Sequence, residues 1–227
     1  MTFEHIPSDY AILKMRVLPS SGGDTLWASG YETFDRISRP YQKFLEGLTA
    51  THDNPSFVAS SQRLGFAIHP GPRGAPENVG TDLIAVHPII RTNPVTGWKS
   101  LYSVLGQVQR INELSKQESD EVLAYLARLI NENHDLQVRM KWGKDDVAIV
   151  SCSISFHPAV GKSVIPGGGI FAENRVLQWD NRCTYHTATV DFDGSKEVRT
   201  GNRAVSMGER PYLDPSSPSR REALGLM

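Results

Sequence analysis

Hydrophobic and polar positions alternate near the start of the chain, where every second residue from Ala11 to Val17 is apolar. A period of two places these side chains on one face of a β-strand. Other stretches read as strands for the same reason or because they are short apolar runs: residues 64–68, 83–86, 136–142, 147–149 and 179–186. The pattern predicts a mainly β domain.

Helical spacing appears in two places. Apolar residues over 34–48 recur at near-helical intervals, with Pro40 marking a break between two short helices. A longer helix is expected after Ser119, because residues 122–130 carry an apolar stripe and acidic residues occupy the first turn. Helices inserted among strands, rather than alternating with them, favour an antiparallel sandwich or jelly roll over a doubly wound sheet.

Composition narrows the class of protein. The 227 residues, 39% hydrophobic and 22% charged, are enough for one globular domain that buries roughly 70% of its unfolded surface. With 24 Lys and Arg against 25 Asp and Glu and no charge run, no nucleic-acid or membrane partner is expected. Two cysteines, Cys152 and Cys183, fit free thiols in a reducing compartment. Because no signal peptide or membrane span is visible, a soluble cytoplasmic protein is the expectation.

The histidines are the first candidates for a metal ligand or a base. One of the seven stands out: His186 lies on an alternating strand with Arg182 and Thr184 on the same face, and Arg199 and Arg203 follow it. A histidine with two downstream arginines indicates an anion site. Four others have structural explanations at strand or helix ends: His52, His69, His87 and His134.

Four motifs then occur in order. They are Gly22-Gly23-Asp24-Thr25-x-Trp27, His87-Pro88-x-x-Arg91-x-x-Pro94-x-Thr96-Gly97, Trp179-Asp180-Asn181-Arg182-x-Thr184-x-His186, and the stretch from Arg199 that ends Gly208-Glu209-Arg210-Pro211. Together they resemble the taurine dioxygenase (TauD/TfdA) family of iron(II)/2-oxoglutarate-dependent dioxygenases, and most closely its fungal sulfonate-dioxygenase branch. The resemblance extends over nearly the whole chain except residues 150–178.

The resemblance implies a double-stranded β-helix, or jelly roll, incomplete at its N-terminus, and a role for each of four residues. His186 matches a ligand of Fe(II) in a two-His-one-carboxylate triad. Thr25 matches a hydroxyl that binds 2-oxoglutarate at the end near the metal, and Arg199 matches the arginine that pairs with the far carboxylate. Arg203 matches the arginine that meets a small anionic substrate such as a sulfonate.

The spacing from His186 is longer than in the bacterial enzyme, so the two arginine roles could be exchanged. Thr25 as a turn hydroxyl and Arg203 as a surface ion-pair partner are the structural alternatives.

One departure from the family concerns the other two iron ligands. A His-x-Asp pair supplies them and directly precedes a Thr-Phe that resembles Thr2-Phe3. No His-x-Asp or His-x-Glu occurs anywhere in the 227 residues. His5 alone does not rebuild the triad. The expectation is therefore an N-terminally truncated family member.

The second departure is the segment 150–178, rich in Gly and Pro, which separates residues 147–149 from Trp179. A lid and an ordinary surface insertion are two interpretations. Val-Ser at its start can be encoded with a splice-donor-like GT, and Gln at its end with AG, so a translated intron is a third. On any of these, residues 1–227 form a single domain of the family.

Two functions follow. The first is a dioxygenase that oxidises a small anion with release of succinate and CO2. The second is a catalytically inactive jelly-roll remnant or anion-binding module that retains Thr25 and the two arginines without iron.

Overall fold

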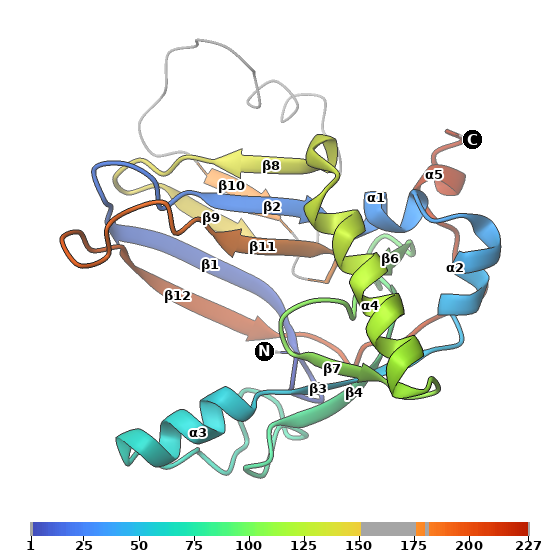
Figure 1. The fold of residues 1–227 in the computed structure, drawn as a ribbon, viewed down its shortest axis with the longest axis horizontal. Coiled ribbons are helices and arrows are strands. Elements are labelled where there is room, and N and C mark those ends of the chain that lie inside the picture. The colour runs from blue at the N-terminus through green and yellow to red at the C-terminus, as the bar shows by residue number, and fades with distance from the viewer. Residues whose placement is uncertain (1, 151–175, 180–181, 227) are drawn as a thin grey trace.

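The structure is a computed structural model that describes residues 2–150, 176–179 and 182–226 (Figure 1). Its strands are β1 (Ser8–Val17), β2 (Thr25–Ser29), β3 (Thr49–Asp53), β4 (Ile84–Pro88), β5 (Ile90–Thr92), β6 (Lys99–Leu101), β7 (Val108–Ile111), β8 (Gln137–Met140), β9 (Val147–Val150), β10 (Val176–Trp179), β11 (Thr184–Ala188) and β12 (Thr200–Met207). Its helices are α1 (Gly30–Asp35), α2 (Arg39–Leu45), α3 (Pro55–Leu64), α4 (Lys116–Asn131), the 3-10 turn η1 (His134–Leu136) and α5 (Arg220–Ala223). The prediction of a mainly β protein with inserted helices is confirmed.

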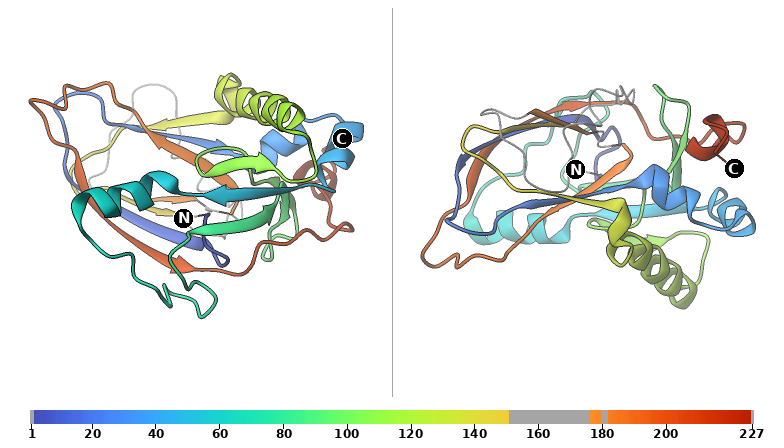
Figure 2. Two further views of the ribbon diagram at one scale, coloured as in Figure 1. Left: turned by 60° about the horizontal axis from the view of Figure 1, so that its bottom comes forward. Right: turned by 90° about the horizontal axis from the view of Figure 1, so that it is seen from above.

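Two sheets face each other (Figures 1 and 2). One has the strand order β10-β9-β1-β12, and the other has the order β11-β2-β8. An apolar cluster fills the space between them: Ala11, Met15, Trp27, Met140, Trp142 and Ala148. The alternation predicted for β1 is therefore real, with Ala11 and Met15 at 3% and 1% exposure, although Val17 at the strand end is 47% exposed.

The larger hydrophobic core lies beside these sheets. It packs the helices α1, α2 and α4 against the smaller sheets β4-β3-β7 and β5-β6. Its most deeply buried side chains include Leu45, Ile90, Leu101, Ile111 and Leu126. This core holds the ends of β2 and β11 in place, because α1 follows β2 without a break and Gly30 donates to the carbonyl of Cys183 at 2.7 Å.

The predicted helices are present, with one boundary moved. α4 contains the apolar stripe but begins a turn before Ser119. Ser115 caps it, and a reciprocal bond with Glu118 completes a capping box. The buried hydroxyl of Ser119 instead accepts from the backbone N–H of Ile111, which ties α4 to β7. Pro40 lies in the first turn of α2, where its missing N–H costs no helical bond.

The strand predicted over residues 64–68 is wrong. Residues up to Leu64 belong to α3, which starts with Asn54 capping Phe57 and ends at Gly65 in the left-handed conformation. Leu64 and Phe66 are 68% and 41% exposed, so the apolar run covers no core. Apolar composition without a consistent period could not distinguish a helix end from a strand here.

The segment 150–178 is described only at its edges. Val150 ends β9, and β10 runs parallel to β9 with Trp179 paired to Val150. The other strand pairs of both large sheets are antiparallel. The remainder of the segment, including Cys152, lies outside the described residues, and so do Asp180 and Asn181. Cys183 is buried and forms no disulfide with any described residue.

None of the helices that the structure describes has the length and hydropathy needed to cross a bilayer.

Candidate active site

His186 lies on β11 directly opposite Trp27 of β2. Opposite residues of an antiparallel pair share a face of the sheet. Trp27 is 2% exposed and belongs to the cluster between the two sheets, so His186 faces the same interior. The two rings are 5.2 Å apart between centroids. His186 itself is exposed, which places it where this interior opens to solvent.

Arg203 approaches the same interior from the opposite sheet. On β12 it lies opposite Leu13, and Gly201 lies opposite Met15, whose buried side chain marks the inner face of β1. Although His186 is exposed overall, neighbouring protein atoms partly desolvate it. This desolvation, together with the positive charge of Arg203, lowers the pKa of His186 to about 4. His186 is therefore a neutral imidazole at pH 7, the form that binds metals.

Thr25 and Arg199 are in direct contact. Thr25 is 3% exposed, and its Oγ1 accepts from Arg199 Nη2 at 3.3 Å and from the indole Nε1 of Trp142 at 2.9 Å. Arg199 also donates from Nε to the carbonyl of Gly23 at 2.7 Å. The guanidinium is thus held against the start of β2, two residues along the strand from the position opposite His186.

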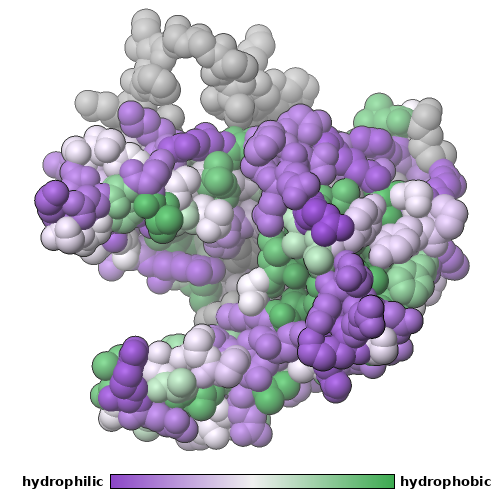
Figure 3. Space-filling model, in the orientation of Figure 1, coloured by the Kyte–Doolittle hydropathy of each residue, from purple (hydrophilic) through white to green (hydrophobic). Residues whose placement is uncertain are grey.

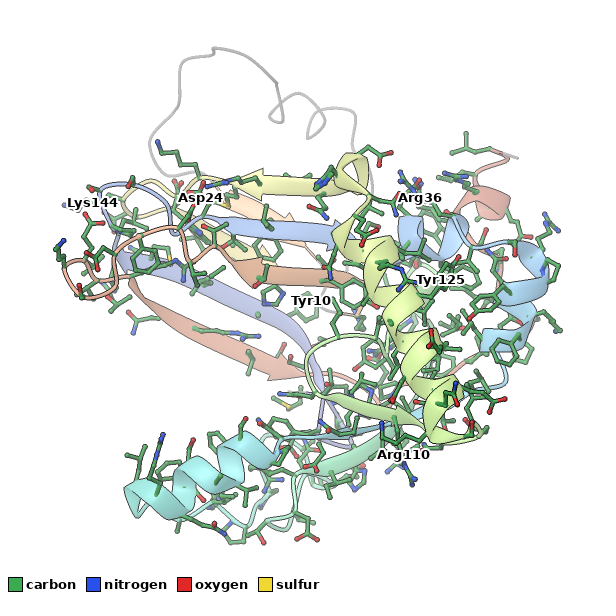
Figure 4. All side chains as sticks on the ribbon, viewed as in Figure 1. Tyr10, Asp24, Arg36, Arg110, Tyr125 and Lys144 are labelled. Carbon is green, nitrogen blue, oxygen red and sulfur yellow. The ribbon has the colours of Figure 1, made fainter. Side chains whose placement is uncertain are left out.

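The Gly-Gly-Asp turn before β2 explains this placement, and Figure 4 shows Asp24 just ahead of the strand. Arg139 bridges two carboxylates, with Nε 2.6 Å from Asp24 Oδ2 and Nη2 2.7 Å from Asp191 Oδ2. Asp191 in turn accepts from the N–H of Gly23 at 3.1 Å. Gly22 and Gly23 have φ of +72° and +69°, and a Cβ on Gly22 would lie 2.6 Å from the carbonyl oxygen of Asp191. Only glycine permits both the conformation and this approach.

Arg199 and Arg203 are the two positively charged residues predicted for the site. Within the described residues, no carboxylate lies at ion-pair distance from either guanidinium, although Asp24 is close enough to Arg199 to favour its charge. Burial lowers the pKa of both arginines. Arg199 is partly buried and Arg203 is exposed. Two guanidinium groups next to one interior can bind anions, since each offers parallel donors to a carboxylate or sulfonate.

The described residues do not by themselves make an iron site. Over residues 2–150, 176–179 and 182–226, no group of three or more His, Cys, Asp or Glu side chains is placed to hold a metal ion. His186 offers one imidazole, and a stable facial site needs two further protein ligands. The chemistry of this donor set fits the anionic 2-oxoglutarate, and it does not fit iron without further ligands.

Three other motif residues meet in a separate polar cluster. Glu209 pairs with both Arg91 and Arg182, the latter at 3.0 Å. Arg91 is 1% exposed and lies 4.9 Å from the Tyr102 ring centroid. The motifs that carry these residues therefore contribute to the core as well as to the site.

The two histidines His52 and His87 have structural partners. His52 bonds Thr2 Oγ1 at 2.8 Å and Ser103 Oγ at 2.9 Å, and His87 Nε2 donates to the carbonyls of Thr2 and Glu4. Their rings are 5.0 Å apart. They tie the N-terminal residues to the β3–β4 pair.

A groove lies elsewhere on the molecule. Figure 3 shows the molecule indented between the two large sheets and α3. A groove of about 830 Å³ lies along α3 itself, lined by residues of α3, of the segment that follows it and of the approach to β4, including Val58, Phe66 and Ile84. None of the four predicted site residues lines it, so its size does not mark the candidate active site.

Trp142 is the site residue that sequence reasoning missed. It appeared only as the last residue of a predicted strand, and the structure places its indole on Thr25. The alternation over residues 136–142 predicts that Trp142 lies on the same face as Met140. The sequence does not show that Met140 pairs with Thr25, and this pairing brings Trp142 to the site. The roles of Thr25, Arg199, Arg203 and His186 stay predictions, although the structure brings all four to one interior.

Comparison with solved structures places the fold. A taurine dioxygenase from Burkholderia xenovorans superposes with a TM-score of 0.65 at 23% identity, covering 95% of this chain and 57% of that one. The fold is thus that of a taurine dioxygenase-like protein. The family model described as taurine catabolism dioxygenase TauD, TfdA family matches residues 1–162. The chain belongs to the TauD/TfdA family.

Curated relatives agree. The α-ketoglutarate-dependent dioxygenase btcD of Neocamarosporium betae is 48% identical over 98% of this chain and 58% of its own length. An α-ketoglutarate-dependent sulfonate dioxygenase of Saccharomyces cerevisiae is 31% identical over 94% of this chain and 42% of its own length. The chain thus spans about half the length of these relatives. The family implies 2-oxoglutarate (α-ketoglutarate) as co-substrate and Fe(II) as metal.

Proposed function

We propose that this chain is part of an iron(II)/2-oxoglutarate-dependent dioxygenase of the taurine/sulfonate type. It oxidises a small anionic substrate, such as a sulfonate, with release of succinate and CO2. The observation that carries the proposal is the contact between Thr25 and Arg199 beside an interior that also receives His186 and Arg203. The sulfonate dioxygenase of S. cerevisiae supports the substrate class.

Thr25 and Arg199 bind the far carboxylate of 2-oxoglutarate together. Because Arg199 Nη2 is 3.3 Å from Thr25 Oγ1, a carboxylate that accepts from this guanidinium is within reach of the hydroxyl. This geometry favours a role for Thr25, shared with Arg199, at the far carboxylate of 2-oxoglutarate. The resemblance implied a role for Thr25 at the other end of 2-oxoglutarate, near the metal. Arg203, on the opposite sheet near His186, is left for the anionic group of the substrate.

Iron requires ligands beyond the described residues. When bound, iron(II) supplies the site at which 2-oxoglutarate and dioxygen react. His186 would be one ligand, held neutral by its surroundings. The chain's own contribution is to orient the two anions by their distant charged ends, Arg199 for one and Arg203 for the other, and to fix the imidazole on β11.

The two facing sheets support a jelly-roll architecture for a single domain over residues 1–227. Residues 150–178 are an insertion within this domain, and we propose that the insertion is a translated intron. The parallel β10 is consistent with an added segment, because the other described pairs of the two large sheets are antiparallel. Sequencing the transcript tests this: reads that join Ile149 to Trp179 support it, and only continuous reads through the segment overturn it.

A catalytically inactive anion-binding module is the second candidate. It is favoured by the fact that His186 is the only imidazole placed at the candidate site among the described residues and by the absence of a His-x-Asp pair from the sequence. In that case Thr25 and the two arginines bind an anion without oxidising it.

Turnover distinguishes the two. We expect no succinate from 2-oxoglutarate when the 227-residue chain is given iron(II), ascorbate and taurine, since one imidazole does not hold iron in a defined geometry. A chimaera that begins with the His-x-Asp segment of a relative and lacks residues 150–178 should produce succinate, and sulfonates, sulfate esters and aryloxyacetates then identify the substrate. Failure of the chimaera with every substrate favours the binding module. Robust turnover by the 227-residue chain contradicts the iron-ligand argument.

A further inference from the structure

Trp142 is held in a fixed position beneath Thr25. Its side chain is 6% exposed and packs in the cluster between the two large sheets. The turn that follows it is closed by Asp146, whose Oδ2 accepts from the N–H of Gly143 at 2.8 Å. On the other side, Met140 is paired with Thr25 across β8 and β2. The indole N–H therefore reaches Thr25 Oγ1 at 2.9 Å from a rigid support.

The hydroxyl of Thr25 has a restricted set of roles. A threonine hydroxyl has one proton to donate and two lone pairs that accept. Trp142 Nε1 and Arg199 Nη2 both donate to it, so both lone pairs are used. Within the described residues, no group accepts the proton of this 3% exposed hydroxyl. An indole can only donate, so it enforces this polarity regardless of pH.

We infer that Trp142 is a positioning residue for the far carboxylate of 2-oxoglutarate, acting through Thr25. The inference rests on the proposed function. By occupying a lone pair of Oγ1, the indole N–H leaves the hydroxyl proton as the group available to an incoming acceptor. The proton and the Arg199 guanidinium then converge on the same carboxylate. A phenylalanine at position 142 would fill nearly the same space but would free the hydroxyl to rotate.

The test compares two ligands that differ only in the far carboxylate, 2-oxoglutarate and 2-oxopentanoate. Ligand-observed NMR titrations of the full chain measure their dissociation constants without turnover. Trp142→Phe should weaken 2-oxoglutarate about fivefold, the effect of one lost neutral hydrogen bond, and leave 2-oxopentanoate unchanged. Trp98→Phe is the matched control, because Trp98 packs edge-on against Tyr31 and does not contact Thr25.

A double-mutant cycle separates positioning from general packing. If Trp142 acts through Thr25, the Thr25→Val/Trp142→Phe protein binds 2-oxoglutarate no more weakly than Thr25→Val alone. In a Thr25→Ser background, Trp142→Phe should still weaken the binding of 2-oxoglutarate, because serine keeps the hydroxyl. Additive losses in the double variant, or equal losses for both ligands, overturn the inference.

Two further outcomes keep the inference distinct from the proposed function. If wild-type protein binds 2-oxoglutarate no better than 2-oxopentanoate, both fail. If wild-type protein prefers 2-oxoglutarate and Trp142→Phe does so equally, only the inference fails. Should Trp142→Phe not fold, the indole N–H resonance of Trp142 provides the readout: 2-oxoglutarate should shift it in wild type but not in Thr25→Val, and no shift in wild type overturns the inference.

Discussion

Arg182 donates to the carboxylate of Glu209 across 3.0 Å, and this ion pair joins the segment that leads into β11 to the segment that follows β12. Glu209 also pairs with Arg91, which is 1% exposed. One carboxylate therefore compensates two buried guanidinium groups near the C-terminal end of the fold.

Glu209→Gln should destabilise the protein by about 3 kcal/mol, because removing the anion takes the counter-ion away from the buried guanidinium of Arg91 and also breaks the pair with Arg182. The value is at the low end for buried pairs because the Glu209 side chain is 33% exposed. Urea unfolding measures it. Asp120→Asn, which breaks the exposed pair with Lys116, is the control and should change stability by less than about 0.5 kcal/mol. Equal effects of the two substitutions would contradict the compensation argument.

Stability should fall as the pH is lowered from about 6.5 towards 4. Burial lowers the pKa of His52 to about 3 and that of His87 to about 4, and the neighbouring rings repel when charged. Both histidines ionise more readily in the unfolded chain, where the pKa is about 6.5, so the unfolded state binds more protons across this window. For His87 the loss by pH 4 is on the order of 3 kcal/mol.

Urea unfolding at fixed ionic strength between pH 7 and 4.5 checks this. His87→Asn should flatten the dependence even though it lowers stability overall, whereas His134→Gln, at an exposed position, should leave the slope unchanged. A wild-type profile that is flat over this range would sink the prediction.

Gly23→Ala should cost more than Gly97→Ala, although the two glycines have nearly the same φ, +69° and +72°. The backbone strain is shared and costs about 1 kcal/mol or more. Only at Gly23 would a Cβ meet neighbours, 2.9 Å from Pro19 Cγ and 3.1 Å from Arg199 Cδ. The difference in free energy of unfolding measures the packing part, and a simultaneous loss of 2-oxoglutarate binding would report displacement of Arg199. Identical costs would show that the turn tolerates a side chain.

Arg199→Ala in the active chimaera should raise the KM for 2-oxoglutarate far more than that for the primary substrate. Losing a hydrogen bond to a charged group costs about 1.5–3 kcal/mol, or roughly a 10- to 100-fold change. Arg199→Lys should restore only part of the loss, since an ammonium cannot make two parallel bonds. Arg203→Ala should raise the KM for the primary substrate far more than that for 2-oxoglutarate. If Arg199→Ala raises only the KM for the primary substrate, the roles of Arg199 and Arg203 must be exchanged.

The parts of this protein that the sequence by itself determined are those governed by neighbouring residues. Period-two alternation located β1, and helical spacing located α4. Each depends on a conformational preference that acts over a few residues, so no distant partner was required. Where the local pattern was ambiguous, over residues 64–68, the prediction was wrong.

Tertiary structure alone decided which of these elements meet. His186 faces the interior because β11 pairs with β2 in the register that sets it opposite Trp27. Trp142 reaches Thr25 across 117 residues of sequence, and Glu209 reaches Arg91 across 118. Strand register and side-chain packing fix such contacts through the burial of the whole core, a collective free energy that no short segment encodes.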